Sequence, residues 1–249
     1  MRGWPSLRRR LRSHFVFEIA GVSIAYCYIR KNACSAFKRL LLDQAGYAGE
    51  WNDALPFLTG TYAPASISQV LAARWRIFVY RDPFERTVSL FRNKMVMAKG
   101  ARDFLTSYAA VTGGDPEDAT FKDFVLNYLP ARSLDPHASS QISALLPLPY
   151  NRVCTLESLA ADMERILGDQ IAQKYFAKRI NHSSSALFHE GSADVPVRLL
   201  RERYQLSGEL PSDDALQTEI LRSRIRQLYR FDYLLAPPTE PSKRFLHRA

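Results

Sequence analysis

The sequence predicts an α/β protein with three layers, α/β/α, around a central, mainly parallel sheet. Two segments, residues 22–29 and 75–80, are almost continuously apolar, as expected for strands that are buried on both faces of a parallel sheet. Each is followed by a short polar turn and then by apolar residues at helical spacing. Alternation of this kind is typical of a parallel sheet covered by the helices that connect its strands.

The N-terminal apolar stretch, residues 15–29, is predicted to open the sheet as a strand rather than to cross a membrane. Glu18 interrupts it, and it is shorter than the ~20 apolar residues that a spanning helix needs. Residues 1–14 are predicted to be a basic tail, which carries Arg8, Arg9, Arg10 and Arg12. A peripheral contact of this tail with an anionic membrane stays open.

Further elements follow from helical spacing and capping residues. A helix is predicted at residues 36–44, and a second at residues 83–97, where Asp82 suits the N-cap and Pro83 the first turn. The other predicted elements are a weaker strand at 151–155 and helices at 156–167, 195–204 and 213–229.

Length and composition favour one domain in a reducing compartment. A chain of 249 residues with 47% apolar content can bury a core, so residues 1–249 are predicted to form one domain with flexible ends, 1–14 and 236–249. Cys27, Cys34 and Cys154 have neither zinc-ligand spacing nor an even number for a disulfide framework. No metal is therefore predicted, and the cytoplasm is the expected location.

The net charge of +9 indicates either an ordinary basic surface or a polyanionic partner. Nucleic acid, an anionic membrane and a phosphate-rich ligand would all suit it. No motif for binding RNA or DNA is present, so a nucleic-acid partner is not predicted.

Two strand-to-helix turns are candidate anion sites, residues 31–35 and 81–82. Ligands of open α/β sheets bind beyond the carboxyl ends of the strands, and the N–H groups that begin a helix attract phosphate. Lys31 and Arg81 add two cations there, and Ser35 adds a hydroxyl. The first turn is not a Walker A loop, because no glycine lies between Gly21 and Gly46, so ATP or GTP hydrolysis is disfavoured.

Residues 24–41 and 75–95 resemble two motifs of the Golgi-type carbohydrate sulfotransferases, the relatives of the chondroitin and dermatan enzymes. Lys31, Cys34, Ser35 and Lys38 match that family's 5′-phosphosulfate loop. The family's 3′-phosphate motif is matched by Arg81, Asp82, Pro83, Phe84, Glu85, Arg86, Val88, Ser89, Arg92 and Lys94. Weaker similarities extend the resemblance to residue 235, through His137, Glu157, Leu159, Asp162, Tyr229, Asp232 and Tyr233.

The chain also departs from the family pattern. Arg30 stands where the family often has proline, and Ala138 follows His137 where the family has tryptophan. The cysteine pair of the Golgi members is missing, which favours a bacterial, cytoplasmic member.

The resemblance implies a P-loop-NTPase-like sulfotransferase fold and a PAPS-dependent sulfotransferase. PAPS, 3′-phosphoadenosine-5′-phosphosulfate, would give its sulfuryl group to a hydroxyl of a carbohydrate or glycoconjugate and leave as PAP, without a metal. The residues implied to hold the 5′ side of the donor are Arg30, Lys31, Asn32, Ala33, Cys34 and Ser35. Arg81 and Ser89 would bind the 3′-phosphate, and Asn181 and Ser183 would close over the nucleotide.

Lys31 and His137 are the implied catalytic residues. Lys31 would stabilise the charge on the leaving phosphate, and His137 would take the proton of the acceptor hydroxyl. Phe104, Tyr108 and Phe121 suit either an acceptor groove or core packing. Two other functions stay open: a non-catalytic module that binds nucleotides or polyanions, and a P-loop-like small-molecule kinase.

Overall fold

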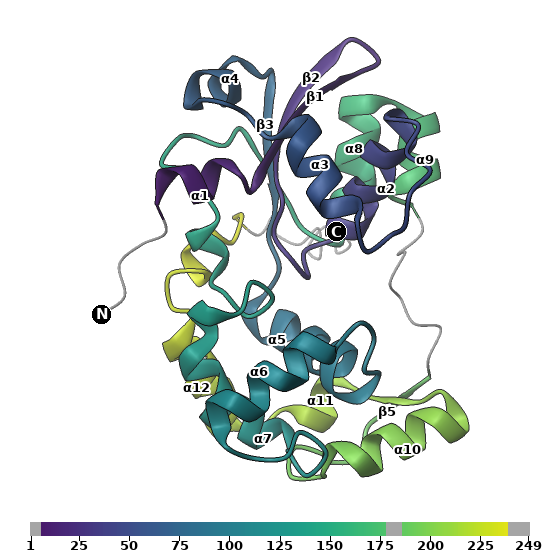
Figure 1. Cartoon of the computed structure of the whole chain (residues 1–249), viewed down its shortest axis with the longest axis vertical. Coiled ribbons are helices and arrows are strands. Elements are labelled where there is room, and N and C mark those ends of the chain that lie inside the picture. Colours follow the sequence, from purple (N-terminus) through teal and green to yellow (C-terminus); the bar gives the residue numbers. More distant parts are fainter. Residues whose placement is uncertain (1–5, 178–185, 239–249) are drawn as a thin grey trace, which may run out of the picture.

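The structure is a computed structural model that describes residues 6–177 and 186–238 (Figure 1). Its centre is a four-stranded sheet in the order β1-β2-β3-β4. The strands are β1 (His14–Ile19), β2 (Val22–Cys27), β3 (Trp75–Val79) and β4 (Arg152–Cys154). β1 pairs antiparallel with β2, and β2, β3 and β4 run parallel. The expectation of an α/β protein with a mainly parallel sheet is therefore confirmed.

The first strand prediction is wrong, because residues 15–29 form a hairpin instead of one strand. β1 and β2 pair up to Ile19 and Val22, which leaves Ala20 and Gly21 as the loop. Both loop residues have positive φ, 52° and 73°. A two-residue loop with positive φ at both residues matches the twist of the two strands. Alanine is uncommon in such turns, so the sequence does not indicate the hairpin.

Helices flank the sheet. One face packs against four helices, whose core includes Tyr26 of β2 stacked on Phe37 at a ring distance of 3.7 Å. These helices are α2 (Cys34–Gln44), α3 (Ala54–Tyr62), α8 (Leu159–Leu167) and α9 (Asp169–Tyr175). The other face packs against residues of α1 (Leu7–Leu11), α4 (Ile67–Ala72) and the segment 142–150.

Part of the predicted basic tail belongs to the folded structure. Arg10 of α1 donates a hydrogen bond to the carbonyl of Leu145 at 3.0 Å. His14 is fully buried at the start of β1, where Nε2 lies 2.7 Å from the hydroxyl of Tyr150. Arg10, Leu11 and His14 thus attach this segment to the sheet, while residues 6–9 and Arg12 are exposed.

A helical half lies beyond the carboxyl ends of the parallel strands, in the lower part of Figure 1. It has its own core, in which Phe104, Tyr108 and Phe121 are buried. Core packing therefore explains these three aromatic residues, and the acceptor-groove interpretation is wrong. The main helices here are α5 (Pro83–Phe91), α6 (Arg102–Thr112), α7 (Phe121–Asp123), α10 (Val197–Ser207), α11 (Asp213–Leu216) and α12 (Glu219–Leu228).

Shorter elements complete this half and its link to the sheet. They are the π-helical turns η1 (Arg92–Val96) and η2 (Phe124–Tyr128), the 3₁₀ turns η3 (Leu129–Leu134), η4 (Gln141–Ser143) and η5 (Tyr233–Leu235), and the paired strands β5 (Leu187–Phe188) and β6 (Leu210–Pro211). Within the described parts of the chain, no helix is long and apolar enough to span a membrane.

All five predicted helices have different bounds in the structure. Those expected at 36–44 and 195–204 span Cys34–Gln44 and Val197–Ser207. The one expected at 213–229 is two helices, because Gln217 is extended and the side chain of Thr218 caps α12 by accepting from the N–H of Leu221. The helix expected at 156–167 begins at Leu159. The one expected at 83–97 is α-helical only to Phe91 and continues as the π turn η1.

Candidate active site

The loop between β2 and α2 has an unusual backbone for a segment without glycine. Lys31 and Ala33 have φ values of 70° and 53°, whereas Asn32 between them does not have a positive φ. Each such residue costs about 1–3 kcal/mol and is typical of functional sites. Backbone that alternates in this way turns N–H groups toward an anion. In a Walker A loop glycines adopt positive φ values without backbone strain, whereas here Lys31 and Ala33 adopt them.

The start of α2 adds to the anion-binding character of this loop. Ala33 is the N-cap residue, and its side chain provides no cap to the first turn of the helix. Cys34 and Ser35 are the first residues of the helix, as the sequence placed them at the loop. The N-terminus of α2 therefore suits a phosphate or sulfate.

The second turn, between β3 and α5, touches the first. Asp82 caps α5 by accepting from the N–H groups of Phe84 and Glu85, at 2.8 and 3.3 Å, as predicted. Arg81 donates from Nη1 to the carbonyl of Lys31 at 3.1 Å, and its Nε lies 3.9 Å from Glu85. The two turns that the sequence singled out are thus joined by Arg81.

Gln141, which sequence reasoning missed, bridges the same two turns. Its Oε1 accepts from the side chain of Asn32 at 2.5 Å and from the N–H of Arg81 at 3.2 Å. Its Nε2 donates to the carbonyl of Arg81 at 2.9 Å. Asp232 in turn accepts from the N–H of Gln141 at 2.8 Å. Motif spacing carries no signal for this bridge, because it joins segments far apart in the sequence.

Asn32 has a structural role in the loop, and the ligand contact expected from its place there stays a prediction. Its side chain is fully buried and donates to the carbonyl of Val79 at 2.7 Å as well as to Gln141. Its own N–H donates to the carbonyl of Ile29 at 3.3 Å. Asn32 therefore fastens the loop to the end of β3.

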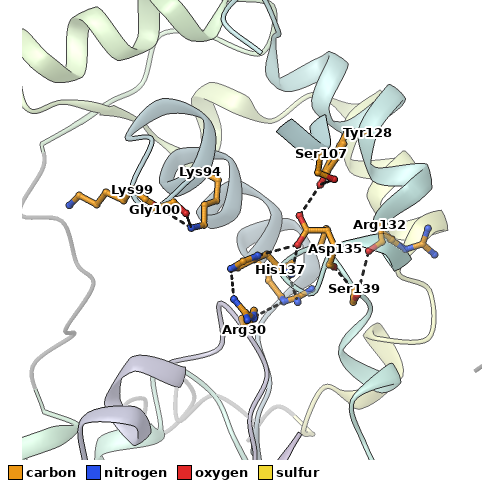
Figure 2. A network of polar contacts seen from close by, with 12 residues as sticks. Arg30, Lys94, Lys99, Gly100, Ser107, Tyr128, Arg132, Asp135, His137 and Ser139 are labelled. Atoms are coloured by element: carbon orange, nitrogen blue, oxygen red, sulfur yellow. Dashed lines mark hydrogen bonds and ion pairs between the residues drawn. The ribbon is translucent and has the colours of Figure 1, made fainter. Parts of the chain in front are cut away.

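His137 lies beside the loop between β2 and α2, where its imidazole contacts the side chain of Arg30 (Figure 2). Its Nε2 is 2.8 Å from Nη1 of Arg30, and its Nδ1 is 3.1 Å from Oδ1 of Asp135. Asp135 also accepts from the hydroxyl of Tyr128 at 2.8 Å. Burial lowers the pKa of His137, the Asp135 hydrogen bond opposes this, and the charge of Arg30 lowers it further. A neutral imidazole of this kind can act as a general base.

Arg86 was matched to a motif but assigned no role by the sequence, and it holds the His137 segment against the loop. It is buried, and it donates from Nε to the carbonyl of Arg30 at 3.2 Å and from Nη2 to the carbonyl of His137 at 3.1 Å. One guanidinium thus joins two backbones that are 107 residues apart. The fork of five donors explains why arginine suits this position.

Positive charge is concentrated around Lys31. Burial lowers its pKa from 10.5 to about 7, and the nearby charges of Arg81, Lys94 and Arg86 lower it further, while Cys34 raises it. Lys94 on η1 donates to the carbonyls of Lys99 and Gly100, at 2.9 and 2.7 Å. An anion bound at the loop would relieve this repulsion, so the site is electrostatically prepared for a phosphate-rich ligand.

The other candidate residues are less closely tied to the loop. Ser89 is half-buried on α5, two helical turns beyond Asp82, and its side chain makes no hydrogen bond to the rest of the described chain. Asn181 and Ser183 lie outside the described residues. In the described ranges, no group of three or more His, Cys, Asp or Glu residues could hold a metal ion.

Comparison with known proteins agrees with this geometry. A model of the sulfotransferase family matches residues 14–235. Carbohydrate sulfotransferase 11 of Danio rerio is 23% identical over 256 aligned residues, which cover 88% of this chain and 65% of the relative. Carbohydrate sulfotransferase 14 of Mus musculus is 29% identical over 162 residues, which cover 57% and 43%. The chain thus spans less than two thirds of these relatives, and no solved structure gives a significant match.

Proposed function

The chain belongs to the sulfotransferase family, and on that premise we propose that it transfers a sulfuryl group from PAPS to a hydroxyl of a carbohydrate or glycoconjugate. Membership of the family implies a P-loop-like fold and PAPS as donor. The observation that carries the proposal is the direct contact between the two anion-binding turns, through Arg81 and the carbonyl of Lys31. PAPS needs two such sites because it carries a 5′-phosphosulfate and a 3′-phosphate.

The loop and α2 are proposed to hold the 5′ side of the donor. The N–H groups at Cys34 and Ser35, the Ser35 hydroxyl and the amine of Lys31 are the ligands expected there. Arg81 and Ser89 are proposed to hold the 3′-phosphate. A guanidinium suits a phosphate better than an ammonium, because it offers two parallel donors.

The proposed chemistry is an in-line displacement at sulfur. The acceptor oxygen bonds to sulfur while the bond from sulfur to the phosphate oxygen breaks, and the electron pair leaves with PAP. Nε2 of His137 takes the acceptor proton, and protonated Lys31 stabilises the charge that develops on the leaving phosphate. Positioning and charge stabilisation supply the catalysis, as in phosphoryl transfer.

The acceptor class rests on the carbohydrate sulfotransferases 11 and 14 to which the chain is similar. The direct test incubates the protein with ³⁵S-labelled PAPS and a panel of glycans, and measures label in the glycan. His137→Gln should lower turnover by about 10²–10⁴-fold if His137 is the base. His189→Gln is the matched control, since His189 is exposed on the helical half.

The same assay separates the alternative functions. Binding of PAP without transfer to any hydroxyl would favour a non-catalytic nucleotide-binding module. Transfer of phosphate from ATP to a small molecule would favour a kinase. Full activity of His137→Gln would assign the base to another residue.

We also propose that the face around α1 contacts an anionic membrane. Arg8, Arg9 and Arg12 are exposed there. Leu234 is 77% exposed at the rim of an apolar cavity of about 650 Å³ that Arg10 also lines. Arginines beside exposed apolar residues are typical of peripheral binding to anionic lipid.

Co-sedimentation with phosphatidylglycerol vesicles, against phosphatidylcholine vesicles, tests this contact. An Arg8→Glu/Arg9→Glu double variant should reduce binding to the anionic vesicles, and equal binding by the variant and the wild type would contradict the membrane contact.

We propose a cytoplasmic location because the three cysteines, Cys27, Cys34 and Cys154, are free thiols, which is typical of a reducing compartment.

A further inference from the structure

The guanidinium of Arg30 donates a hydrogen bond to the lone pair of Nε2 of His137, the nitrogen that would act as the base. Nη1 of Arg30 lies 2.8 Å from Nε2 of His137, as Figure 2 shows. A guanidinium is a donor only and stays charged at any ordinary pH. Nε2 must therefore be the acceptor, and its lone pair points at a permanent cation that cannot take a proton from it.

The contact of Nδ1, the other ring nitrogen of His137, with Asp135 indicates the same protonation state. Nδ1 lies 3.1 Å from Oδ1 of Asp135, and an ionised carboxylate only accepts, so Nδ1 carries the hydrogen. Asp135 is itself held by the N–H of His137 at 2.7 Å and the hydroxyl of Tyr128 at 2.8 Å. The ring is thus the neutral Nδ1–H tautomer, which a general base requires, with Nε2 covered by Arg30.

Arg30 is also placed to reach the proposed donor. It immediately precedes Lys31 in the loop, and its carbonyl is fixed by Arg86. Arg86 holds the backbones at Arg30 and His137. Within residues 6–177 and 186–238, the guanidinium of Arg30 itself hydrogen-bonds only to the imidazole of His137. The guanidinium can therefore turn while the backbone stays in place.

We propose that Arg30 is a positioning residue that covers the base in the free protein and moves onto the 5′-phosphosulfate when the donor binds. Hydrogen bonds from a guanidinium to a phosphate oxygen are charge-assisted and frequently bidentate, so they are stronger than one bond to a neutral imidazole. Donor binding then uncovers Nε2, and the acceptor is deprotonated only when a sulfuryl group is in place. This inference rests on the proposed function, because it takes PAPS as the ligand.

The charges that face His137 define the expected response. The cations are Arg30 from the loop, Arg86 from α5 and Lys94 from η1, and the anion is Asp135 in the same segment as the imidazole. The edge-on ring of Phe104 and burial complete the surroundings. Because Arg30 lowers the pKa of His137, its departure should raise that pKa, and a bound anion should raise it further.

The test is a pH titration of the histidine ring nitrogens by ¹⁵N NMR, with PAP binding measured by calorimetry on the same samples. A His137→Gln variant identifies the His137 signals among the five histidines. Saturating PAP should raise the pKa of His137 in the wild-type protein. Arg30→Gln should raise it without PAP, and PAP should then add less. Arg39→Gln is the matched control, because Arg39 is exposed on α2, and it should titrate like wild type.

Two outcomes would overturn the inference. The first is PAP binding that leaves the titration of His137 unchanged. This result would agree with PAPS as donor but would contradict the coupling between donor binding and the movement of Arg30 away from His137. The second is an unchanged His137 pKa in folded, PAP-free Arg30→Gln. Absence of PAP binding to the wild type would instead overturn the donor itself, and the coupling with it.

Discussion

The side-chain amide of Asn32 donates to Oε1 of Gln141 at 2.5 Å, although 109 residues separate the two. Both side chains are fully buried. Through Gln141 the loop after β2 is joined to the backbone of Arg81 after β3. The distance between the two proposed phosphate sites is therefore set by a third segment, in which Gln141 begins η4.

Gln141→Ala should weaken both the fold and donor binding. The substitution removes one of the two acceptors of the buried Asn32 amide, together with the hydrogen bonds of Gln141 to the backbone of Arg81, which costs about 1–3 kcal/mol. Urea unfolding should show this loss of stability, and calorimetry should show weaker PAP binding in the folded variant. Gln227→Ala, on an exposed face of α12, should change stability by no more than about 0.5 kcal/mol. A Gln141→Ala protein as stable as wild type, with unchanged PAP affinity, would contradict the bridge.

Donor binding should take up a proton at and above neutral pH. In the free protein the pKa of Lys31 is lowered from 10.5 to about 7, chiefly by burial, so the amine loses its proton as the pH rises through 7. A bound anion favours the charged amine and raises this pKa. PAP affinity should therefore fall from pH 7 to pH 9.

Calorimetry in buffers of different ionisation enthalpy measures this proton uptake directly. Lys31→Met should bind PAP more weakly and lose most of the uptake near pH 8. Uptake that persists unchanged in Lys31→Met would assign the proton to another group.

Cys34 should report donor binding by its chemical accessibility. It is half-buried at the first position of α2, whereas Cys27 and Cys154 are fully buried and burial raises the pKa of both thiols. Iodoacetamide should therefore label Cys34 first in the native protein, and PAP should slow that labelling. Mass spectrometry of peptides, with Cys34→Ser as control, measures the rates. Labelling of Cys34 at the same rate under saturating PAP would place the anion elsewhere.

Local signals in the sequence predicted the frame of the site well. The apolar runs gave β2 and β3, and Asp82 with Pro83 gave the start of α5, because these depend on neighbours within a few residues. The same locality explains the errors. The Ala20–Gly21 turn uses a residue with no turn preference, and the break at Gln217 depends on one capping threonine.

Contacts between distant segments were beyond the sequence pattern. Lys31 and Arg81 were both expected at the carboxyl edge of the sheet, and the structure joins them. Gln141 and Arg86 received no role, because their roles depend on hydrogen bonds to distant backbone groups. Asn32 was assigned to the ligand from its position in the loop, but which way its side chain points is set by the packing of β3.

The most direct test of the account compares PAP with ADP by calorimetry, for wild type, Arg81→Ala and Arg74→Ala. Arg74 is exposed just before β3, at the end of that strand away from the site, so its variant should match wild type. We predict that wild type prefers PAP to ADP, and that Arg81→Ala lowers PAP affinity by about 1.5–3 kcal/mol, roughly tenfold or more, while ADP binding changes little. An equal loss for both nucleotides would mean that Arg81 acts only on the loop. Equal binding of PAP and ADP by the wild type, or no binding of PAP, would contradict the assignment of this site to PAPS.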